Sequence, residues 1–339
     1  MAAAKIKIVL SSLLRMSGWF ALRSRLALKN KAAIFMYHRV LPQELVNETN
    51  IPIQPGMYVS PRSLRLHLSY LKNYFSLISL AELVRRLQTG EDISRCAVLT
   101  FDDGWRDNYL YAFPILQKFN VPATIFLTSG FIGTVQRFWP EEIGWAVLSV
   151  YRGIVDISLL PDPLSHMLKK RRSRKQDICE NIDQIIADMK SWDTSRRLSV
   201  TQQCTQLRIK TIAESKRLLM NWDEVREMAK SGLIDFGSHT VSHALLDQLQ
   251  PENVRQELIE STAQIRKESG IQTELFAYPN GNYTPQILAT LPESGITAAV
   301  TTKRGLVAQN SLLLELPRIA VHDDISHTQA LFQWRLFVK

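Results

Sequence analysis

An acidic turn, Thr100-Phe101-Asp102-Asp103-Gly104, ends the apolar run Cys96-Ala97-Val98-Leu99, which is typical of a buried strand. Successive side chains of a strand point to opposite faces, so two adjacent aspartates serve one site only where the strand ends. Gly104 permits a turn there, because glycine tolerates backbone angles that are closed to other residues. Paired carboxylates at such a strand end can bind a metal and move a proton. Taken alone, the same residues also fit an ordinary Asp-Asp-Gly turn.

A pair of histidines lies far downstream, in His239-Thr240-Val241-Ser242-His243, directly after the strand-like segment 233–237. Their spacing of four predicts both imidazoles on one side of a helical turn. Two histidines and one carboxylate make a three-ligand site for a divalent ion. Such a site leaves coordination positions open for water and substrate, which indicates a catalytic rather than a structural metal.

The two motifs together resemble the first two motifs of the polysaccharide deacetylases, carbohydrate esterase family 4, which share the homology domain of the nodulation-type chitooligosaccharide deacetylases. The resemblance extends over about residues 34–321 and is poorest between residues 145 and 219. It implies an α/β fold, a distorted (β/α) barrel. It also implies an enzyme that hydrolyses linear amides.

The resemblance also implies roles for the motif residues. Asp103, His239 and His243 would hold a divalent metal ion, with zinc expected, and Asp102 would take the proton of the attacking water. The expected substrate is an N-acetylhexosamine unit of a polysaccharide or oligosaccharide, such as an exopolysaccharide, and the products are acetate and a free amino sugar.

The segment 275–281 resembles the third motif of the family, a turn that shapes the pocket. In this alignment Asn280 would present its backbone N–H to the developing oxyanion, and Tyr278 and Pro279 would contact the substrate. The chain departs from the commoner form at Ala277, where the arginine of the family would fall.

A replacement for that arginine is available in the late strand 316–319. A charge-assisted hydrogen bond from Arg318 to Asp102 would orient the catalytic carboxylate. The alternative for Arg318 is a salt bridge at the surface or at an interface.

Two histidines are candidates for the general acid that protonates the departing amine. His38 follows the strand-like segment 33–37, and one branch of the family places a Tyr-His segment near its active site. His322 resembles the last motif of the family only superficially, so we favour His38. We also expect Trp139, at the start of the insertion described next, to contact the substrate.

Strand-like and helix-like segments alternate from residue 60 onward, which predicts parallel strands joined by crossover helices. Pro61 and Trp222 are expected to begin helices, and a helix over 105–119 is expected to bend at Pro114. The length of 339 residues suits one domain with an insertion or two domains equally. We expect one barrel over 33–339 with a helical insertion at about 140–219.

Residues 1–32 form a basic, amphipathic segment that is too interrupted for a membrane span and has no clear signal peptide. We favour a helix packed on the body of the protein, with a helix lying on a membrane surface as the alternative. These features indicate a cytoplasmic location or one peripheral to the inner membrane. The basic residues of the segment are Lys5, Lys7, Arg15, Arg23, Arg25, Lys29 and Lys31.

The net charge of +9 suits anionic glycans, phosphate-bearing lipid carriers or membrane surfaces, and no recognisable motif supports a nucleic-acid partner. Other functions stay open from the sequence. The chain could remove an acyl or formyl group from a lipid-linked or nucleotide-linked amino sugar, cleave O-esters on xylan, or bind glycans without catalysis.

Overall fold

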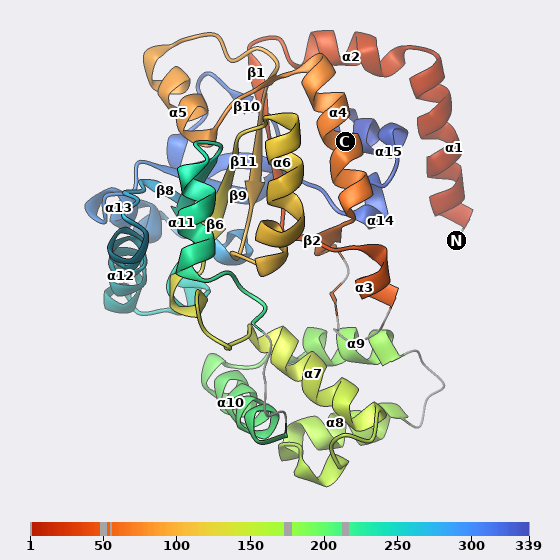
Figure 1. The fold of residues 1–339 in the computed structure, drawn as a ribbon, viewed down its shortest axis with the longest axis vertical. Coiled ribbons are helices and arrows are strands. Elements are labelled where there is room, and N and C mark those ends of the chain that lie inside the picture. The colour runs from red at the N-terminus through yellow and green to blue at the C-terminus, as the bar shows by residue number, and fades with distance from the viewer. Residues whose placement is uncertain (1, 48–52, 55, 173–177, 212–216, 339) are drawn as a thin grey trace. The chain divides into compact units, whose positions relative to one another are not determined.

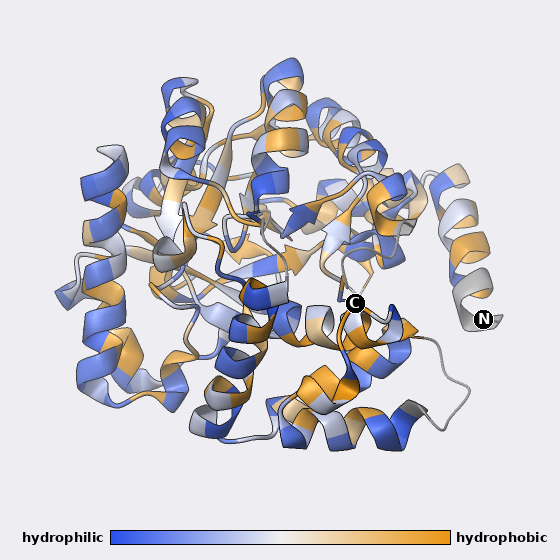
Figure 2. Ribbon diagram, turned by 60° about the horizontal axis from the view of Figure 1, so that its bottom comes forward, coloured by the Kyte–Doolittle hydropathy of each residue, from blue (hydrophilic) through white to orange (hydrophobic). Residues whose placement is uncertain are grey.

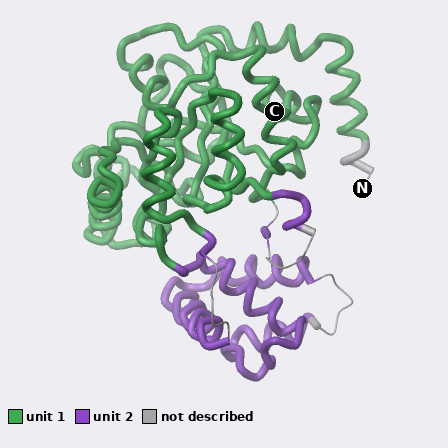
Figure 3. Tube along the Cα trace, viewed as in Figure 1, with its two compact units in different colours: residues 1–41, 55–134, 219–339 green, residues 42–54, 135–218 purple. Residues whose placement is uncertain are grey.

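The structure is a computed structural model that describes residues 2–47, 53–54, 56–172, 178–211 and 217–338. The chain forms two compact units (Figure 3). Unit 1 comprises residues 1–41, 55–134 and 219–339, and unit 2 comprises residues 42–54 and 135–218. Each unit contains a hydrophobic core of its own.

Unit 1 is built on a closed barrel of parallel strands (Figure 1). The ring closes because the strand that carries the acidic turn pairs with the first strand, with Ile34 opposite Val98. The expected (β/α) barrel is therefore confirmed. In ring order the strands are β1 (Lys31–Tyr37), β11 (Leu316–Ala320), β9 (Ala298–Arg304), β8 (Leu275–Ala277), β7 (Ile234–Ser238), β6 (Ala123–Leu127) and β5 (Cys96–Phe101).

Short strands extend this sheet beyond the ring. β10 (Val307–Ala308) pairs antiparallel with the start of β1, and β4 (Ser76–Leu77) pairs parallel with β5. A separate pair joins β2 (Arg39–Val40) to β3 (Tyr58–Val59). Strand β5 is buried along its whole length, as the continuous apolar run 96–99 predicts for a barrel strand covered on both faces.

Helices surround the barrel and begin where the sequence predicts. Ser60 caps α4, whose first residue is Pro61, and Asn221 forms a capping box with Glu224 at the start of α11. The helices that follow the barrel strands are α4 (Pro61–Tyr74), α5 (Leu80–Thr89), α6 (Phe113–Phe119), α11 (Trp222–Lys230), α12 (Pro251–Ser269), α13 (Pro285–Glu293), α14 (Asp323–Ser326) and α15 (Gln329–Phe337).

The segment 105–119 differs from the single bent helix that we expected. A π-helical stretch, Asn108–Ala112, leads into α6. The physical reason is Pro114, which has no backbone N–H and whose ring crowds the carbonyl four residues earlier, so the regular α-helical pattern cannot run through it.

In the described residues of the predicted insertion, the secondary-structure elements of unit 2 are helices. Glu142 and Arg208 form a buried ion pair inside the unit, with hydrogen bonds of 2.8 and 2.6 Å. The short helix α3 (Gln43–Asn47) also belongs to this unit. The helices of the insertion are α7 (Trp139–Tyr151), α8 (Asp162–Arg172), α9 (Ile178–Lys190) and α10 (Thr194–Thr211).

Two helices precede the barrel, α1 (Ala2–Met16) and α2 (Trp19–Ala27), and both pack on α15. The favoured expectation of a helix packed on the body holds for one face of α1 only, because Ser11 is buried whereas Val9 and Leu13 are exposed. Among the residues that the structure describes, no helix combines the length and the hydropathy needed to cross a bilayer.

Candidate active site

Strands β5 and β7 place the two sequence motifs at the same edge of the barrel. Both strands are parallel neighbours of β6, so their carboxyl ends meet there. The acidic turn follows β5, with Asp103 at φ 78° and Gly104 at φ 80°. A Cβ on Gly104 would lie 2.9 Å from the Ile132 side chain. Both the backbone angle and the lack of space therefore require glycine at the turn.

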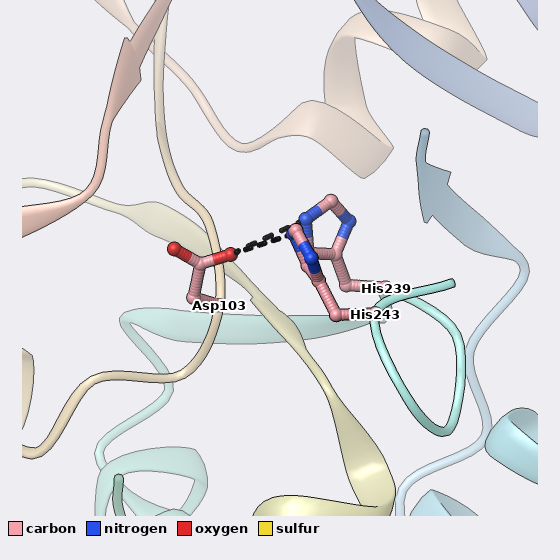
Figure 4. A group of neighbouring side chains, drawn as sticks. All are labelled: Asp103, His239 and His243. Carbon is pink, nitrogen blue, oxygen red and sulfur yellow. Dashed lines mark ion pairs between the residues drawn. The ribbon is translucent and has the colours of Figure 1, made fainter. Parts of the chain in front are cut away.

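The structure brings the three predicted metal ligands together (Figure 4). The Nε2 atoms of His239 and His243 each lie 3.4 Å from Oδ1 of Asp103. Asp103 and His239 are buried, and the His243 side chain is 29% exposed. The cluster is thus closed on the side of the barrel and reachable from solvent beside His243.

The donor atoms of this cluster fit a divalent cation. Oδ2 of Asp103 accepts a hydrogen bond of 2.8 Å from the indole of Trp105, but the buried Oδ1 accepts none from a described residue. Nδ1 of His239 donates to the carbonyl of Ala277 at 2.7 Å, which leaves the Nε2 lone pair directed at Asp103. A cation bound here would satisfy both the orphaned carboxylate oxygen and the imidazole lone pairs.

Charge in the cluster also favours a cation. Burial lowers the pKa of His239, but the nearby carboxylates of Asp103 and Asp102 outweigh burial and raise it. Burial raises the pKa of Asp103, but the two histidines outweigh burial and hold that pKa well below its usual range. The negative potential that draws a proton onto His239 would equally attract a metal ion.

The loop that carries the histidine pair is not the helical turn that the spacing predicts. Thr240 and His243 have positive φ angles of 66° and 58°, so the chain turns twice through the left-handed region. Glu257 of α12 holds this loop, because its carboxylate accepts hydrogen bonds from the backbone N–H groups of Val241 and Ser242 at 2.7 and 3.1 Å. It also accepts the Ser242 hydroxyl at 2.6 Å. Sequence reasoning missed Glu257.

Arg318 holds the second carboxylate of the acidic turn. Its two terminal nitrogens donate to the two oxygens of Asp102, each at 2.7 Å, and its Nε donates to the carbonyl of Thr301. Burial raises the pKa of Asp102, but the charge and hydrogen bonds of Arg318 outweigh burial, so the pKa is lowered. A register shift between Leu316 and Arg318 in the pairing of β11 with β9 accompanies this arrangement. Asp102 is therefore an ionised, oriented carboxylate beside the predicted metal ligands.

His38 lies next to this base, with its Nε2 atom 3.9 Å from Oδ2 of Asp102. Burial lowers the pKa of His38 and outweighs the charges of Asp103 and Asp102, which raise it. Asn108 fixes the backbone of His38 by donating to its carbonyl at 2.8 Å. Asp107 fixes the residues that follow, since it accepts the N–H of Val40 at 2.8 Å.

Arg39 and Asp107 form a buried ion pair of 2.9 Å behind this backbone, and the Arg39 guanidinium lies over the Trp105 ring. Sequence reasoning missed Asp107 and Asn108, although both lie within four residues of Gly104. Their signal is their closeness to the acidic motif.

The third motif forms a tight turn, Pro279–Gly281, after β8. Asn280 has a positive φ of 57°, and a Cβ on Gly281 would meet the Thr302 side chain at 2.0 Å. Tyr278 and Pro279 are both buried at this turn, and their contact with substrate stays a prediction. The Tyr278 hydroxyl donates to the carbonyl of Leu314 at 2.9 Å, so this ring supports the turn from behind.

Two further candidates contact residues other than those of the Asp103 cluster. His322 precedes α14 and its Nδ1 atom lies 3.0 Å from Oδ2 of Asp324. Trp139 begins α7 in unit 2, with the Arg197 guanidinium 5.4 Å from its ring centre. The substrate contact of Trp139 stays a prediction, as does our preference for His38 over His322.

The fold and the site define a barrel hydrolase with an Asp-Asp and a His-His motif on nearby strand ends. Residues 89–169 and 200–299, more than half of the chain, match the family described as "Polysaccharide deacetylase". The chain therefore belongs to the polysaccharide deacetylase family, whose members are hydrolases acting on amides.

Named relatives agree with this assignment. Bacillus subtilis YxkH, named as a polysaccharide deacetylase, is 21% identical over 298 residues, which cover 87% of this chain and 73% of that protein. The poly-β-1,6-N-acetyl-D-glucosamine N-deacetylase of Staphylococcus epidermidis is 29% identical over 113 residues, 31% of this chain and 39% of that protein. The fold is similar to the Streptococcus pyogenes deacetylase PplD, with a TM-score of 0.57, 21% identity and coverage of 90% of this chain and 98% of that one.

Proposed function

We propose that the protein is a metal-dependent deacetylase that removes N-acetyl groups from N-acetylhexosamine units of a polysaccharide or oligosaccharide. The observation that carries this proposal is an ionised carboxylate, Asp102, fixed by Arg318 beside the Asp103, His239 and His243 cluster. The similarity to the staphylococcal enzyme, whose name specifies poly-N-acetylglucosamine, supports this substrate class.

Asp103, His239 and His243 would hold the ion, and a set of two imidazoles and one carboxylate suits zinc. When bound, such an ion lowers the pKa of a coordinated water and polarises the acetamide carbonyl. The chain supplies the remaining groups. The backbone carbonyl of Ala277 fixes the tautomer of His239.

Proton transfer falls to Asp102 and His38. Asp102 removes a proton as water oxygen bonds to the acetamide carbon, and Arg318 keeps Asp102 ionised and aimed. The C–N bond then breaks, and the nitrogen leaves as an amine because it takes up that proton. His38 lies 3.9 Å from Asp102 and its lowered pKa keeps the ring mainly neutral, so it relays the proton from Asp102 rather than holding one in advance.

Stabilisation of the oxyanion is assigned to the backbone N–H of Asn280, in the tight turn after β8. Well-placed donors of this kind contribute roughly 3 kcal/mol to lowering the barrier. The positive φ of Asn280 and the closeness of Gly281 to Thr302 fix the backbone of this turn without help from a ligand.

The test is acetate release by the purified full chain, before and after removal of metal and after addition of zinc. The substrates are chitooligosaccharides, poly-N-acetylglucosamine and nucleotide-linked N-acetylhexosamines. We expect release that chelation abolishes and zinc restores, and no release by Asp102→Asn with its metal content intact. Release that is indifferent to chelator would contradict the metal-dependent mechanism. A metal-free protein inert on every substrate would instead favour a non-catalytic glycan-binding relative.

A further inference from the structure

The first two helices carry an unusual concentration of positive charge. Residues 1–32 contain seven basic residues and no acidic one, since the first acidic residue of the chain is Glu44. This short segment thus supplies seven of the nine net positive charges of the whole chain. The charge is local to one end of the chain rather than spread over the surface.

Helix α1 also exposes its apolar side. Its largest exposed apolar residues recur at the three- and four-residue spacing of one helix face. Met16 is 84% and Ile6 is 65% exposed, although buried apolar stripes are the rule for helices of globular proteins. The residues of this stripe are Ile6, Val9, Leu10, Leu13 and Met16.

The packing of α1 on the body accounts for that exposure. α1 contacts α15, and the residue it buries completely is the small, polar Ser11. At 100° per residue, Ser11 lies on the opposite side of the helix from Ile6 and Leu13. The helix therefore turns its Ser11 side to the protein and its apolar stripe outward. It lies at the edge of unit 1 (Figures 1 and 2).

Helix α2 also exposes apolar side chains. Phe20 is buried and its ring lies 6.2 Å from that of Phe337 in α15, whereas Leu22 and Leu26 are exposed. The exposed Arg23 and Arg25 flank these two leucines on the helix surface. Two consecutive helices thus present apolar side chains bordered by cations.

We propose that the outward faces of α1 and α2 dock on the surface of an anionic lipid bilayer. The apolar side chains would insert to the depth of the acyl chains, and the basic side chains would contact the anionic headgroups. A second copy of the chain fits less well, because it would bring one strongly basic segment against another. This proposal does not rest on the catalytic one and stands if the substrate proves different.

The test is flotation of the full chain with vesicles of phosphatidylcholine, with or without phosphatidylglycerol. We expect binding to the anionic vesicles that falls as salt is raised, because surface charges are screened. The variant Leu13→Ser/Leu22→Ser is expected to bind roughly tenfold or more weakly. Its control is Leu159→Ser/Leu312→Ser, which removes two leucines that are 62% and 67% exposed elsewhere in the chain and is expected to bind like the wild type.

Two further double variants test the contribution of the basic residues. Arg15→Gln/Arg23→Gln is expected to weaken binding by roughly fivefold per charge. Lys169→Gln/Lys170→Gln changes the net charge equally in exposed residues of α8 and is expected to leave binding unchanged. Absence of binding to anionic vesicles would overturn the proposal, as would equal losses in the test and control variants. A third outcome would also overturn it: the wild type is a dimer that does not bind vesicles, and Leu13→Ser/Leu22→Ser converts it to a monomer. A second copy of the chain would then cover these faces.

Discussion

Arg318 compensates for the burial of Asp102, and the protonation state of this proposed base depends on Arg318. The Arg318 guanidinium donates to both carboxylate oxygens of Asp102. Hydrogen bonds to the carbonyl of Thr301 and the hydroxyl of Thr100 fix the position of the guanidinium. Removal of these bonds leaves burial as the dominant influence, which raises the pKa of a carboxyl group. Arg318 is thus a positioning residue that acts through Asp102.

Arg318→Lys is expected to lower kcat/KM and to move the acid limb of its pH profile to higher pH. The sign follows because Asp102 must be ionised to accept a proton, and a lysine cannot reproduce the two-pronged bond that lowers its pKa. The measurement is the pH dependence of kcat/KM, with circular dichroism as the check on folding. An unchanged acid limb would show that Arg318 does not set the ionisation of the base.

Glu257→Gln is expected to weaken zinc binding by roughly tenfold, because the carboxylate holds the loop that carries a metal ligand. The backbone of His243 is in the left-handed region, so the loop needs that support. The measurement is zinc affinity by competition with a chromophoric chelator, which is independent of turnover. Glu260→Gln on the exposed side of α12 is the control. Equal affinities in the two variants would make Glu257 a bystander.

The motif residues of the site could be predicted because each motif is a short, continuous stretch of sequence. Asp102 is next to Asp103, and the two histidines lie four residues apart. Arg318 had to be inferred, because Ala277 stands where the arginine of the family would fall. Glu257 could not be predicted, since it is one of several acidic residues on the polar side of α12. Its role arises only when the barrel brings α12 against the loop after β7.

At the scale of elements, His67 joins α4 to two other parts of unit 1. Its Nε2 donates to the carbonyl of Ser326 in α14 at 2.8 Å, and its Nδ1 accepts from the Tyr37 hydroxyl of β1 at 3.2 Å. The ring also stacks on Phe332 of α15. Both nitrogens are satisfied only by the neutral form, and burial lowers the pKa of His67 to about 4.

His67 is therefore expected to make folding stability depend on pH. Its pKa is about 6.5 in the unfolded chain and about 4 in the folded one, so the unfolded state binds more protons between these values. The stabilisation is complete above pH 6.5 and is lost as pH falls towards 4, by about 3 kcal/mol in all. Urea unfolding of the wild type and of His67→Gln across this range measures the effect. A parallel pH dependence in the two proteins would contradict the assignment.

Elements with local signals could be predicted, and elements under competing constraints could not. The capping residues Ser60 and Asn221 mark the starts of α4 and α11 correctly. The loop 239–243 was predicted as a helical turn because a spacing of four suits a helix, but two left-handed residues bring the same side chains together. The π-helical stretch before Pro114 likewise depends on how the chain relieves one missing hydrogen bond.

At the scale of the whole molecule, alternating strands and helices predicted the closed barrel, because each crossover adds a parallel strand. The membership of residues 42–54 in unit 2 could not be predicted, since it depends on contacts distant in sequence. The charge distribution is a further property of this scale. The net charge alone does not show where on the molecule the basic residues lie. The exposed faces of α1 and α2 show where apolar and basic groups lie together.

The separate core of unit 2 predicts that its stability can be changed without affecting the predicted metal ligands. Glu142 and Arg208 are both buried, so Glu142→Ala leaves a buried guanidinium without its carboxylate and is expected to cost roughly 3–5 kcal/mol within this unit. Asp188→Ala removes an ion pair whose carboxylate is 53% exposed and is expected to cost less than about 1 kcal/mol.

Hydrogen exchange resolved by peptide, together with zinc affinity, distinguishes a local from a global effect of Glu142→Ala. We expect faster exchange in α7 and α10, because the lost pair joins these helices, with exchange in β5 and β7 and zinc affinity unchanged. Local opening is the physical reason, since the core of unit 2 contains no residue of the barrel core. Equal acceleration in β5 and β7 would show that the two units unfold as one, and the insertion would then be a structural part of the barrel rather than a unit with its own stability.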